Sequence, residues 1–149
     1  MILVDANLLI YAVDRDAPHH KAARKWLESV FSGAVTVGFS WGVILAFLRL
    51  TTRPGILVRP MPPESALGFI DDWLSLPMVE IVTPGDRHWA VFRNLLKTAG
   101  TAGNLTSDAH LAALALERGA TVFSADADFA RFPGLLHVNP LRRSDRPGA

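Results

Sequence analysis

Four aspartates stand where a parallel α/β sheet would bring their carboxylates together. Asp5 directly follows an apolar run at the start of the chain, and Asp126 and Asp128 follow another apolar run near its end. Asp108 lies in the first turn of the predicted helix that leads into that second run. Parallel strands point the same way, so both runs end at one edge of the sheet, where ligands of such folds bind.

Carboxylates gathered in this way repel one another, and the repulsion indicates the chemistry that they serve. Two carboxylates about 4 Å apart repel by roughly 4 kcal/mol at an effective dielectric constant of about 20. Such a cluster persists when a cation offsets the repulsion or when a proton is shared. Oxygen ligands favour Mg²⁺ or Mn²⁺ over zinc, and no pair of histidines has convincing zinc-ligand spacing. The chain has no cysteine, which excludes thiolate catalysis and thiolate zinc sites.

Each aspartate taken alone also has an ordinary structural interpretation. Asp5 could cap the helix predicted at Asn7, and Asp108 could complement the N-terminus of its own helix. Asp126 and Asp128 could simply form a turn. The prediction of a metal site therefore depends on the joint placement of the four residues at one edge.

The elements that must position these residues alternate between strands and helices. Apolar runs predict strands at Met1–Val4, Ala34–Gly38, Val79–Val82, Thr121–Ser124 and Leu136–Val138. Helical spacing of apolar residues predicts helices at Asn7–Val13, Pro18–Ser32, Trp41–Leu50, Glu64–Leu76, Asp86–Thr98 and Leu105–Arg118. This alternation predicts an α/β fold, a small parallel sheet of about four to five strands flanked by helices.

Composition and charge exclude several classes of protein. The 149 residues suit one domain, and a chain that is 50% hydrophobic and 19% charged is not a disordered protein. No apolar run approaches the roughly 18 residues of a membrane span, and the start lacks the basic segment of a secretory signal. We therefore expect a cytoplasmic protein with no membrane partner. Because the net charge is only +1, any surface that binds nucleic acid must come from local clusters of basic residues.

Other residues that could do chemistry have simpler interpretations. The four tryptophans lie at apolar positions of predicted helices, which indicates a role in the core rather than in base stacking. His110 stands two residues from Asp108, so it should point away from it on the helix, and we interpret it as structural. No serine has a plausible Ser-His-Asp arrangement, and no glycine-rich phosphate loop is present.

Both ends of the chain resemble a known family. The segments VDANLLIYAV, GNLTSDAHLAALALERGATVFSADADFARFPGL and the final NPL resemble PIN-domain ribonucleases, above all the VapC-type toxins of bacterial toxin–antitoxin pairs. The segment SWGVILAFLRLTTRP is similar to the corresponding helix of one VapC subgroup. The resemblance implies one PIN-like ribonuclease domain over residues 1–141, followed by a polar C-terminal tail over residues 142–149.

The resemblance also implies a role for each acidic residue. Asp5 matches the first metal-binding acid, Asp108 matches the second principal metal ligand, and Asp126 matches the acid that completes the catalytic pocket. Asp128 matches a frequent additional acid in a supporting role. Polar neighbours that line the pocket in relatives match Asn7 and Thr106 or Ser107.

One expected residue is missing. Many relatives place a glutamate on the helix after the second strand, whereas Trp41–Leu50 contains no acid and Ala46 lies near the expected position. Either Asp128 supplies the missing charge or the metal is held more weakly. The alternative to an enzyme is therefore a catalytically inactive PIN fold that acts as a protein-binding module.

For an active enzyme, the resemblance implies a metal-dependent endoribonuclease toxin. Bound Mg²⁺, or Mn²⁺ in its place, would lower the pKa of its water and stabilise charge on the scissile phosphate of a structured RNA, such as transfer RNA or ribosomal RNA. VapC relatives are usually homodimers, inhibited by a VapB-type antitoxin whose C-terminal segment occupies a groove beside the site. Trp41, Leu45 or Leu48 would lie near that groove, although a core role suits each.

Two other families with acidic α/β sites fit less well. A haloacid-dehalogenase-type phosphatase needs a second aspartate two residues after the first, where this chain has Asn7. A receiver-type signalling module needs an acceptor aspartate after its third strand, where this chain has Thr83 and Pro84. It also needs a lysine near its fifth strand, and no lysine follows Lys97.

Overall fold

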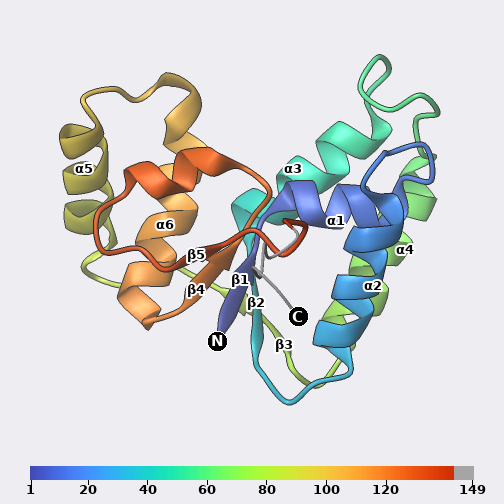
Figure 1. Ribbon diagram of the computed structural model, residues 1–149, viewed down its shortest axis with the longest axis horizontal. Coiled ribbons are helices and arrows are strands. Elements are labelled where there is room, and N and C mark those ends of the chain that lie inside the picture. Colours follow the sequence, from blue (N-terminus) through green and yellow to red (C-terminus); the bar gives the residue numbers. More distant parts are fainter. Residues whose placement is uncertain (143–149) are drawn as a thin grey trace, which may run out of the picture.

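A parallel sheet lies at the centre of the computed structural model, which describes residues 1–142 (Figure 1). The strand order is β3-β2-β1-β4-β5, and all neighbouring strands are parallel. The strands are β1 (Ile2–Val4), β2 (Val37–Ser40), β3 (Val79–Val82), β4 (Thr121–Phe123) and β5 (His137–Val138). This arrangement confirms the predicted α/β fold with a small parallel sheet.

Helices flank the sheet on both sides (Figure 1). They are α1 (Ala6–Val13), α2 (His20–Phe31), α3 (Trp41–Thr52), α4 (Pro63–Leu74), α5 (His88–Ala99) and α6 (Thr106–Arg118). Two short 3₁₀ helices, η1 (Gly103–Leu105) and η2 (Ala127–Arg131), precede α6 and follow β4. Helices α5 and α6 pack together on one side of the molecule, and α1 packs on α2 and α3 on the other. No helix within residues 1–142 is long and apolar enough to cross a membrane.

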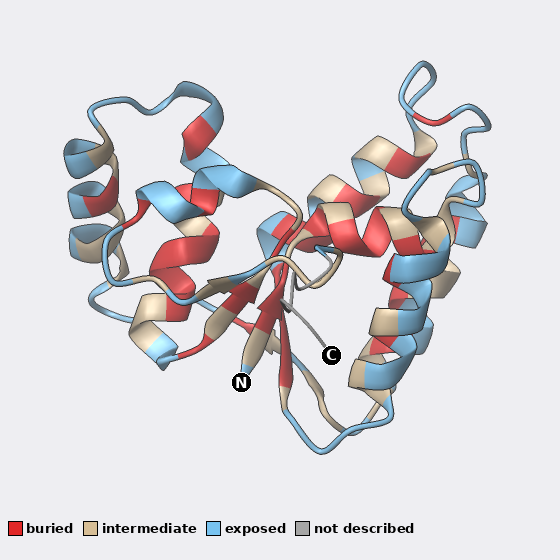
Figure 2. Cartoon of the chain, in the orientation of Figure 1, coloured by how far each residue is buried: buried red, intermediate tan, exposed pale blue. Residues whose placement is uncertain are grey.

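The central strands are buried on both faces, which explains their continuous apolar sequences. Buried residues concentrate in the strands and on the helix faces turned toward the sheet (Figure 2). Leu3 of β1 pairs with Gly38 of β2 and with Val122 of β4. A Cβ atom on Gly38 would lie 2.5 Å from Leu3 Cδ2 and 2.5 Å from Val82 Cγ2. The sheet centre is therefore packed too closely to accept a side chain at Gly38.

Two sequence predictions need correction. Strand β2 begins at Val37 rather than at Ala34 and continues to Ser40, because its backbone pairs residue by residue with β3. The tryptophans do not all lie in the core: Trp73 is buried, whereas Trp41 is 53% and Trp89 is 69% exposed. Helical spacing identifies the apolar face of a helix, but the packed neighbours decide how far that face is covered. The predicted tail, after its first residue, lies outside the described residues.

We expect Gly38→Ala to lower the free energy of unfolding by about 1–3 kcal/mol, because the added methyl group must displace buried side chains. Gly68→Ala is the matched control, since Gly68 lies in α4 and a Cβ there would meet nothing within 4 Å. That control should be neutral or raise stability by up to about 1 kcal/mol. Urea denaturation of both variants measures the difference, and equal stabilities would contradict close packing at the sheet centre.

Candidate active site

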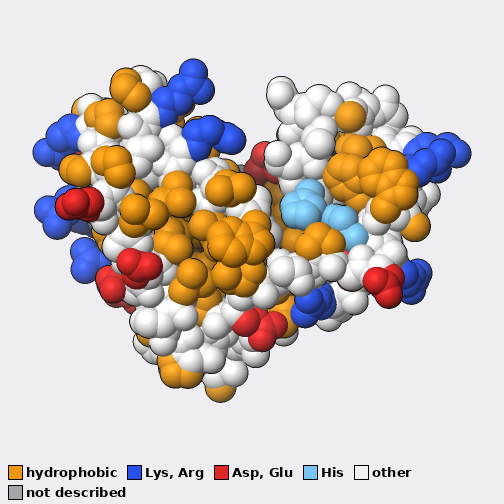
Figure 3. All heavy atoms as spheres, turned by 180° about the vertical axis from the view of Figure 1, so that it is seen from behind, with side chains coloured by type: hydrophobic (Ala, Val, Ile, Leu, Met, Phe, Trp, Pro, Cys, Tyr) orange, Lys and Arg blue, Asp and Glu red, His pale blue; other side chains and the backbone are white. Residues whose placement is uncertain are grey.

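A cavity of about 510 Å³ opens beside the carboxyl ends of β1 and β2. Its volume lies within the roughly 300–1,000 Å³ of typical ligand sites. Its walls come from the end of β1, from α3, and from the first turns of α5 and α6. Figure 3 shows a hollow between the two halves of the molecule, with histidine side chains gathered on one of its walls. The cavity thus lies at the sheet edge where the sequence predicts a site.

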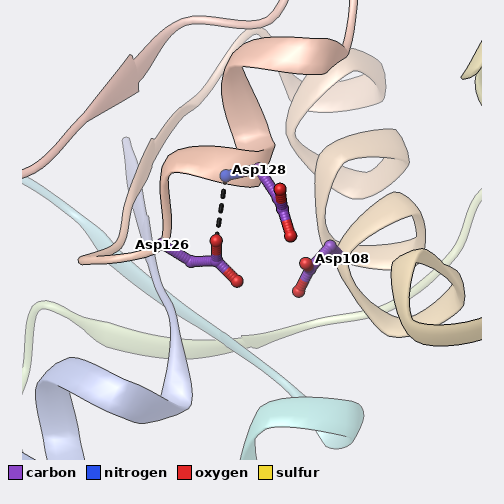
Figure 4. Close-up of side chains that lie close together, drawn as sticks. All are labelled: Asp108, Asp126 and Asp128. Carbon is purple, nitrogen blue, oxygen red and sulfur yellow. Dashed lines mark hydrogen bonds between the residues drawn. The ribbon is translucent and has the colours of Figure 1, made fainter.

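Three of the predicted aspartates lie close together at this edge. One carboxylate oxygen from each of Asp108, Asp126 and Asp128 lies within 4.8 Å of the other two (Figure 4). Asp108 is half-buried in the first turn of α6, while Asp128 is exposed on η2. The Asp128 backbone N–H donates a 2.9 Å hydrogen bond to Asp126 Oδ1, which fixes the start of η2. Asp108, which precedes β4 in the chain, and Asp126 and Asp128, which follow it, therefore surround one small space.

Asp5 borders the same cavity from the end of β1, beside this group of three. It is the N-cap of α1, because Oδ1 accepts a 2.8 Å hydrogen bond from the backbone N–H of Ala6. Its Oδ2 accepts a 2.7 Å hydrogen bond from the Ser124 hydroxyl group. The capping interpretation of Asp5 is thus confirmed, with the helix beginning at Ala6 rather than at Asn7. Capping and metal binding are compatible, because a carboxylate offers about four lone-pair positions.

Ser124 connects the two strand ends that carry the aspartates. Its hydroxyl group donates to Asp5 Oδ2 and accepts hydrogen bonds from Asn7 Nδ2 at 3.1 Å and from the Asp126 backbone N–H at 3.0 Å. Asn7 Oδ1 in turn accepts a 3.3 Å hydrogen bond from the Ala125 N–H. Asn7, which the resemblance to relatives places in the pocket lining, is not among the residues that line the cavity and instead holds the loop after β4 in place.

Sequence reasoning missed Ser124, which is fully buried. A catalytic serine would need a histidine beside it, whereas the Ser124 hydroxyl group orients Asp5 and the Asp126 backbone. Its place directly after the apolar residues of β4 and two residues before Asp126 was the available signal. A small polar residue buried at a strand end has a hydrogen-bonding role, since an unpaired buried hydroxyl is costly.

The remaining predicted residues divide between the cavity walls. Thr106 and Ser107 are exposed and line the cavity beside Asp108. On the opposite wall, the cavity is lined by Ala46 of α3, which lies near the position where the resemblance leads us to expect a glutamate. That wall is apolar apart from Ser40 and Arg49.

His110 lines the same cavity as Asp108, although it stands only two residues from it on the helix. The two residues do leave α6 in different directions. However, the cavity extends around the first turn of α6 toward α5, where the ring of His110 contacts His88 at 2.9 Å. One cavity therefore borders both side chains.

Burial and mutual repulsion raise the pKa values of the site carboxyl groups. Burial, followed by the charges of the three other aspartates, raises the pKa of Asp108 from 3.8 to about 7. Burial also raises the pKa of Asp5, and the charge of Asp126 adds to this, against the hydrogen bonds from Ser124 and Ala6. Both effects disfavour the charged forms, and a bound divalent cation would offset them. A donor set made of carboxylate oxygens fits Mg²⁺ or Mn²⁺.

A parallel α/β domain with an acidic cavity at the carboxyl edge of its sheet is the architecture of PIN domains, and the family model described as "PIN domain" matches residues 2–135. Ribonuclease VapC37 of Mycobacterium tuberculosis is 47% identical over 140 residues, covering 94% of this chain and 97% of that protein. Ribonuclease VapC33 of the same species is 39% identical over 142 residues, covering 95% and 99%. The chain belongs to the PIN-domain family and, within it, to the VapC ribonucleases.

Solved structures agree with this fold. VapBC2 from Rickettsia felis, bound to a DNA fragment from its promoter, has a TM-score of 0.68 at 22% identity and covers 93% of this chain and 98% of its own. VapC20 of Mycobacterium tuberculosis, a toxin that cleaves the sarcin-ricin loop, has a TM-score of 0.68 at 20% identity, with coverages of 94% and 100%. These structures confirm the fold, and the family model with the ribonuclease relatives confirms the resemblance stated from the sequence.

The raised pKa of Asp108 predicts how the stability of the metal-free protein depends on pH. Between 3.8 and about 7 the folded protein binds more protons than the unfolded chain. The free energy of unfolding should therefore fall as pH rises through this window. Urea denaturation in EDTA should show a weaker fall for Asp108→Asn than for the wild type. Asp71→Asn, which changes an exposed aspartate of α4, is the control and should keep the wild-type dependence.

Millimolar Mg²⁺ or Mn²⁺ should raise the melting temperature of the wild type and flatten this pH dependence, since binding to the folded state stabilises it by mass action. Asp71→Asn should respond to the ions as the wild type does, and Asp108→Asn much less. Identical pH profiles for the wild type and Asp108→Asn, with no response to either ion, would show that the carboxylates do not form a shared cation site.

Proposed function

We propose that this chain is a metal-dependent endoribonuclease toxin that hydrolyses phosphodiester bonds of structured RNA and is inhibited by a cognate VapB-type antitoxin. The observation that carries the proposal is the convergence of Asp108, Asp126 and Asp128 on one small space. Asp108 and Asp5 also line the open cavity beside it. The relatives named as ribonucleases, at up to 47% identity over almost the whole chain, support it. The cytoplasm, where transfer RNA and ribosomal RNA occur, is the proposed location.

The four carboxylates have different roles in binding the cation. Asp5 and Asp108 project from a strand end and a helix first turn, and these rigid supports suit direct metal ligands. Asp126 completes the site from the loop after β4. Asp128 is exposed, lies in the same close group and takes the place of the acid missing at Ala46. When bound, Mg²⁺ or Mn²⁺ supplies the charge that activates water and stabilises the scissile phosphate.

The apolar wall of the cavity suits a protein partner. Trp41 and Leu45 lie one turn apart on α3 and are 53% and 58% exposed, and Leu45 lines the cavity. Leu48 packs against the core instead. An antitoxin segment that covers Leu45 would also close the route to Asp108. The structural relative from Rickettsia felis is a VapBC complex, which supports an antitoxin as partner. A homodimer is proposed on family resemblance alone.

We expect Asp5→Asn and Asp108→Asn to reduce RNA cleavage below detection, because each removes a charge that binds the cation while keeping the shape of the side chain. Asp128→Asn should lower the rate about tenfold to a hundredfold and recover with added Mn²⁺. Asp71→Asn should match the wild type. Cleavage of a panel of transcribed transfer RNAs and ribosomal RNA fragments across a metal titration measures these rates.

Wild-type rates for Asp108→Asn would overturn the site assignment. Complete loss in Asp128→Asn without rescue by Mn²⁺ would show that this residue is itself a direct ligand. A wild-type chain that cleaves no RNA with either ion, yet binds its antitoxin, would support the inactive protein-binding fold instead.

Coexpression tests the antitoxin. The chain should co-purify with the product of the adjacent small reading frame, and the double variant Trp41→Ala/Leu45→Ala should weaken the complex at least about tenfold, because two exposed apolar side chains lose their burial on binding. Leu67→Ala is the control, since Leu67 is 49% exposed on α4, away from the cavity. If the wild type, the double variant and Leu67→Ala bound the antitoxin with equal affinity, the antitoxin would have to bind another face.

A further inference from the structure

The segment that contains α3 carries positive charge alone. Between residues 29 and 63 the chain has no aspartate, glutamate, lysine or histidine, and its charged residues are Arg49, Arg53 and Arg59. All three arginines are exposed. Helix α3 runs outward from the sheet toward the loop that carries Arg59 (Figure 1). The last turn of α3 and the loop beyond it therefore present basic side chains with no acidic residue of the same segment among them.

Arg49 and Arg53 lie one turn apart at the end of α3. The Arg53 backbone N–H donates a 3.1 Å hydrogen bond to the Arg49 carbonyl oxygen, and Arg53 is the C-cap of the helix. Arg59, further along the chain, is already paired, because its Nη2 lies 3.1 Å from Asp16 Oδ1. Within residues 1–142, Arg49 and Arg53 form no ion pair. The charges of these two residues are therefore available to a ligand.

Arg49 lines the cavity that Asp5 and Asp108 also line, and no other lysine or arginine of the described residues does so. At about 510 Å³ the cavity has the size of a site for one ligand, so a nucleotide held at the aspartates lies close to the guanidinium group. A guanidinium group is always charged, and its planar fork matches two oxygens of a phosphate. Arg49 can thus attract an anion into a cavity whose aspartates repel it.

We propose that Arg49 binds the backbone phosphate next to the cleaved one, and that Arg53 contacts the RNA backbone further along the strand, which leaves the cavity over the last turn of α3. An RNA backbone suits these arginines better than a protein segment, because it offers a negative charge at every nucleotide. The exposed apolar side chains that suit a protein, Trp41 and Leu45, lie on the earlier turns of α3. The inference rests on the proposed function, because it needs an RNA strand in this cavity.

Equilibrium binding gives the first test, independent of cleavage. In an Asp5→Asn background with Mg²⁺, Arg49→Gln should weaken the binding of a labelled stem-loop RNA about tenfold, as expected for a hydrogen bond between charged groups. The slope of log K against log salt concentration should become shallower by about one, because one phosphate contact is lost. Arg49→Lys should keep the slope and lose part of the affinity, since lysine has no planar fork. Arg53→Gln should change both quantities in the same direction and by less.

Arg93→Gln is the matched control for these binding measurements. It removes the same charge from an exposed arginine of α5 that does not line the cavity. Its affinity and salt dependence should equal those of the background protein. A loss that is equal in Arg93→Gln and Arg49→Gln would show an effect of net charge alone and would overturn the proposal.

Cleavage by the wild-type chain gives the second test and identifies the phosphate. A neutral methylphosphonate replaces the phosphates on either side of the cut, one linkage at a time. At one adjacent linkage it should lower kcat/KM of the wild type about tenfold, mainly through KM, and it should have little effect on Arg49→Gln. Arg93→Gln should keep the full penalty at that linkage.

The outcomes separate this contact from the proposed function. Unchanged RNA binding in Arg49→Gln, or an equal methylphosphonate penalty in Arg49→Gln and the wild type, overturns the contact even when cleavage depends on Asp108. Antitoxin binding lost in Arg49→Gln while RNA binding persists assigns the arginine to the protein partner and also overturns it. RNA binding that depends on Arg49, in a wild-type chain that cleaves no RNA, supports the contact and contradicts the proposed enzyme.

Discussion

The site aspartates meet because the ends of β1 and β4 lie side by side, and the buried hydroxyl group of Ser124 links these two ends. The Asp5 backbone N–H donates a 2.9 Å hydrogen bond to the Phe123 carbonyl, which continues the parallel ladder to the last residue. Ser124 then contacts the Asp5 carboxylate and the Asp126 backbone at once. A strand slip of one residue would turn these side chains to the other face of the sheet.

This arrangement places negative charges together against their repulsion, and the rest of the fold must supply the stability that permits it. The sheet centre does so with largely buried apolar strands and a glycine where β2 passes between its neighbours. The raised pKa values of Asp5 and Asp108 show that the charged forms of both carboxyl groups remain unfavourable in the folded protein. An acidic site of this kind is unfavourable by itself and becomes favourable when a cation binds, which links function to stability.

The two sides of the cavity have different chemical characters. The side formed by α5 and α6 carries the ionisable and hydroxyl groups, namely Asp108, Thr106, Ser107 and the His88–His110 pair, together with the apolar Trp89, Phe92 and Leu111. The side formed by α3 is apolar, with Arg49 at its margin and no acid at Ala46. A cation and the backbone of an RNA suit the first side, and an apolar protein segment suits the second. One cavity can thus serve both a substrate and an inhibitor.

The sequence by itself determined the parallel α/β fold, the helix that begins after Asp5 and the aspartates at the sheet edge, because local periodicity and capping encode these features. The tertiary structure alone decided the contacts between distant residues. Ser124 bonds to Asp5 across 119 positions, and Glu117 to His88 across 29. It also decided that Trp41 and Trp89 stay exposed and that His110 shares a cavity with Asp108. Exposure and long-range hydrogen bonds depend on how whole elements pack, which no local pattern records.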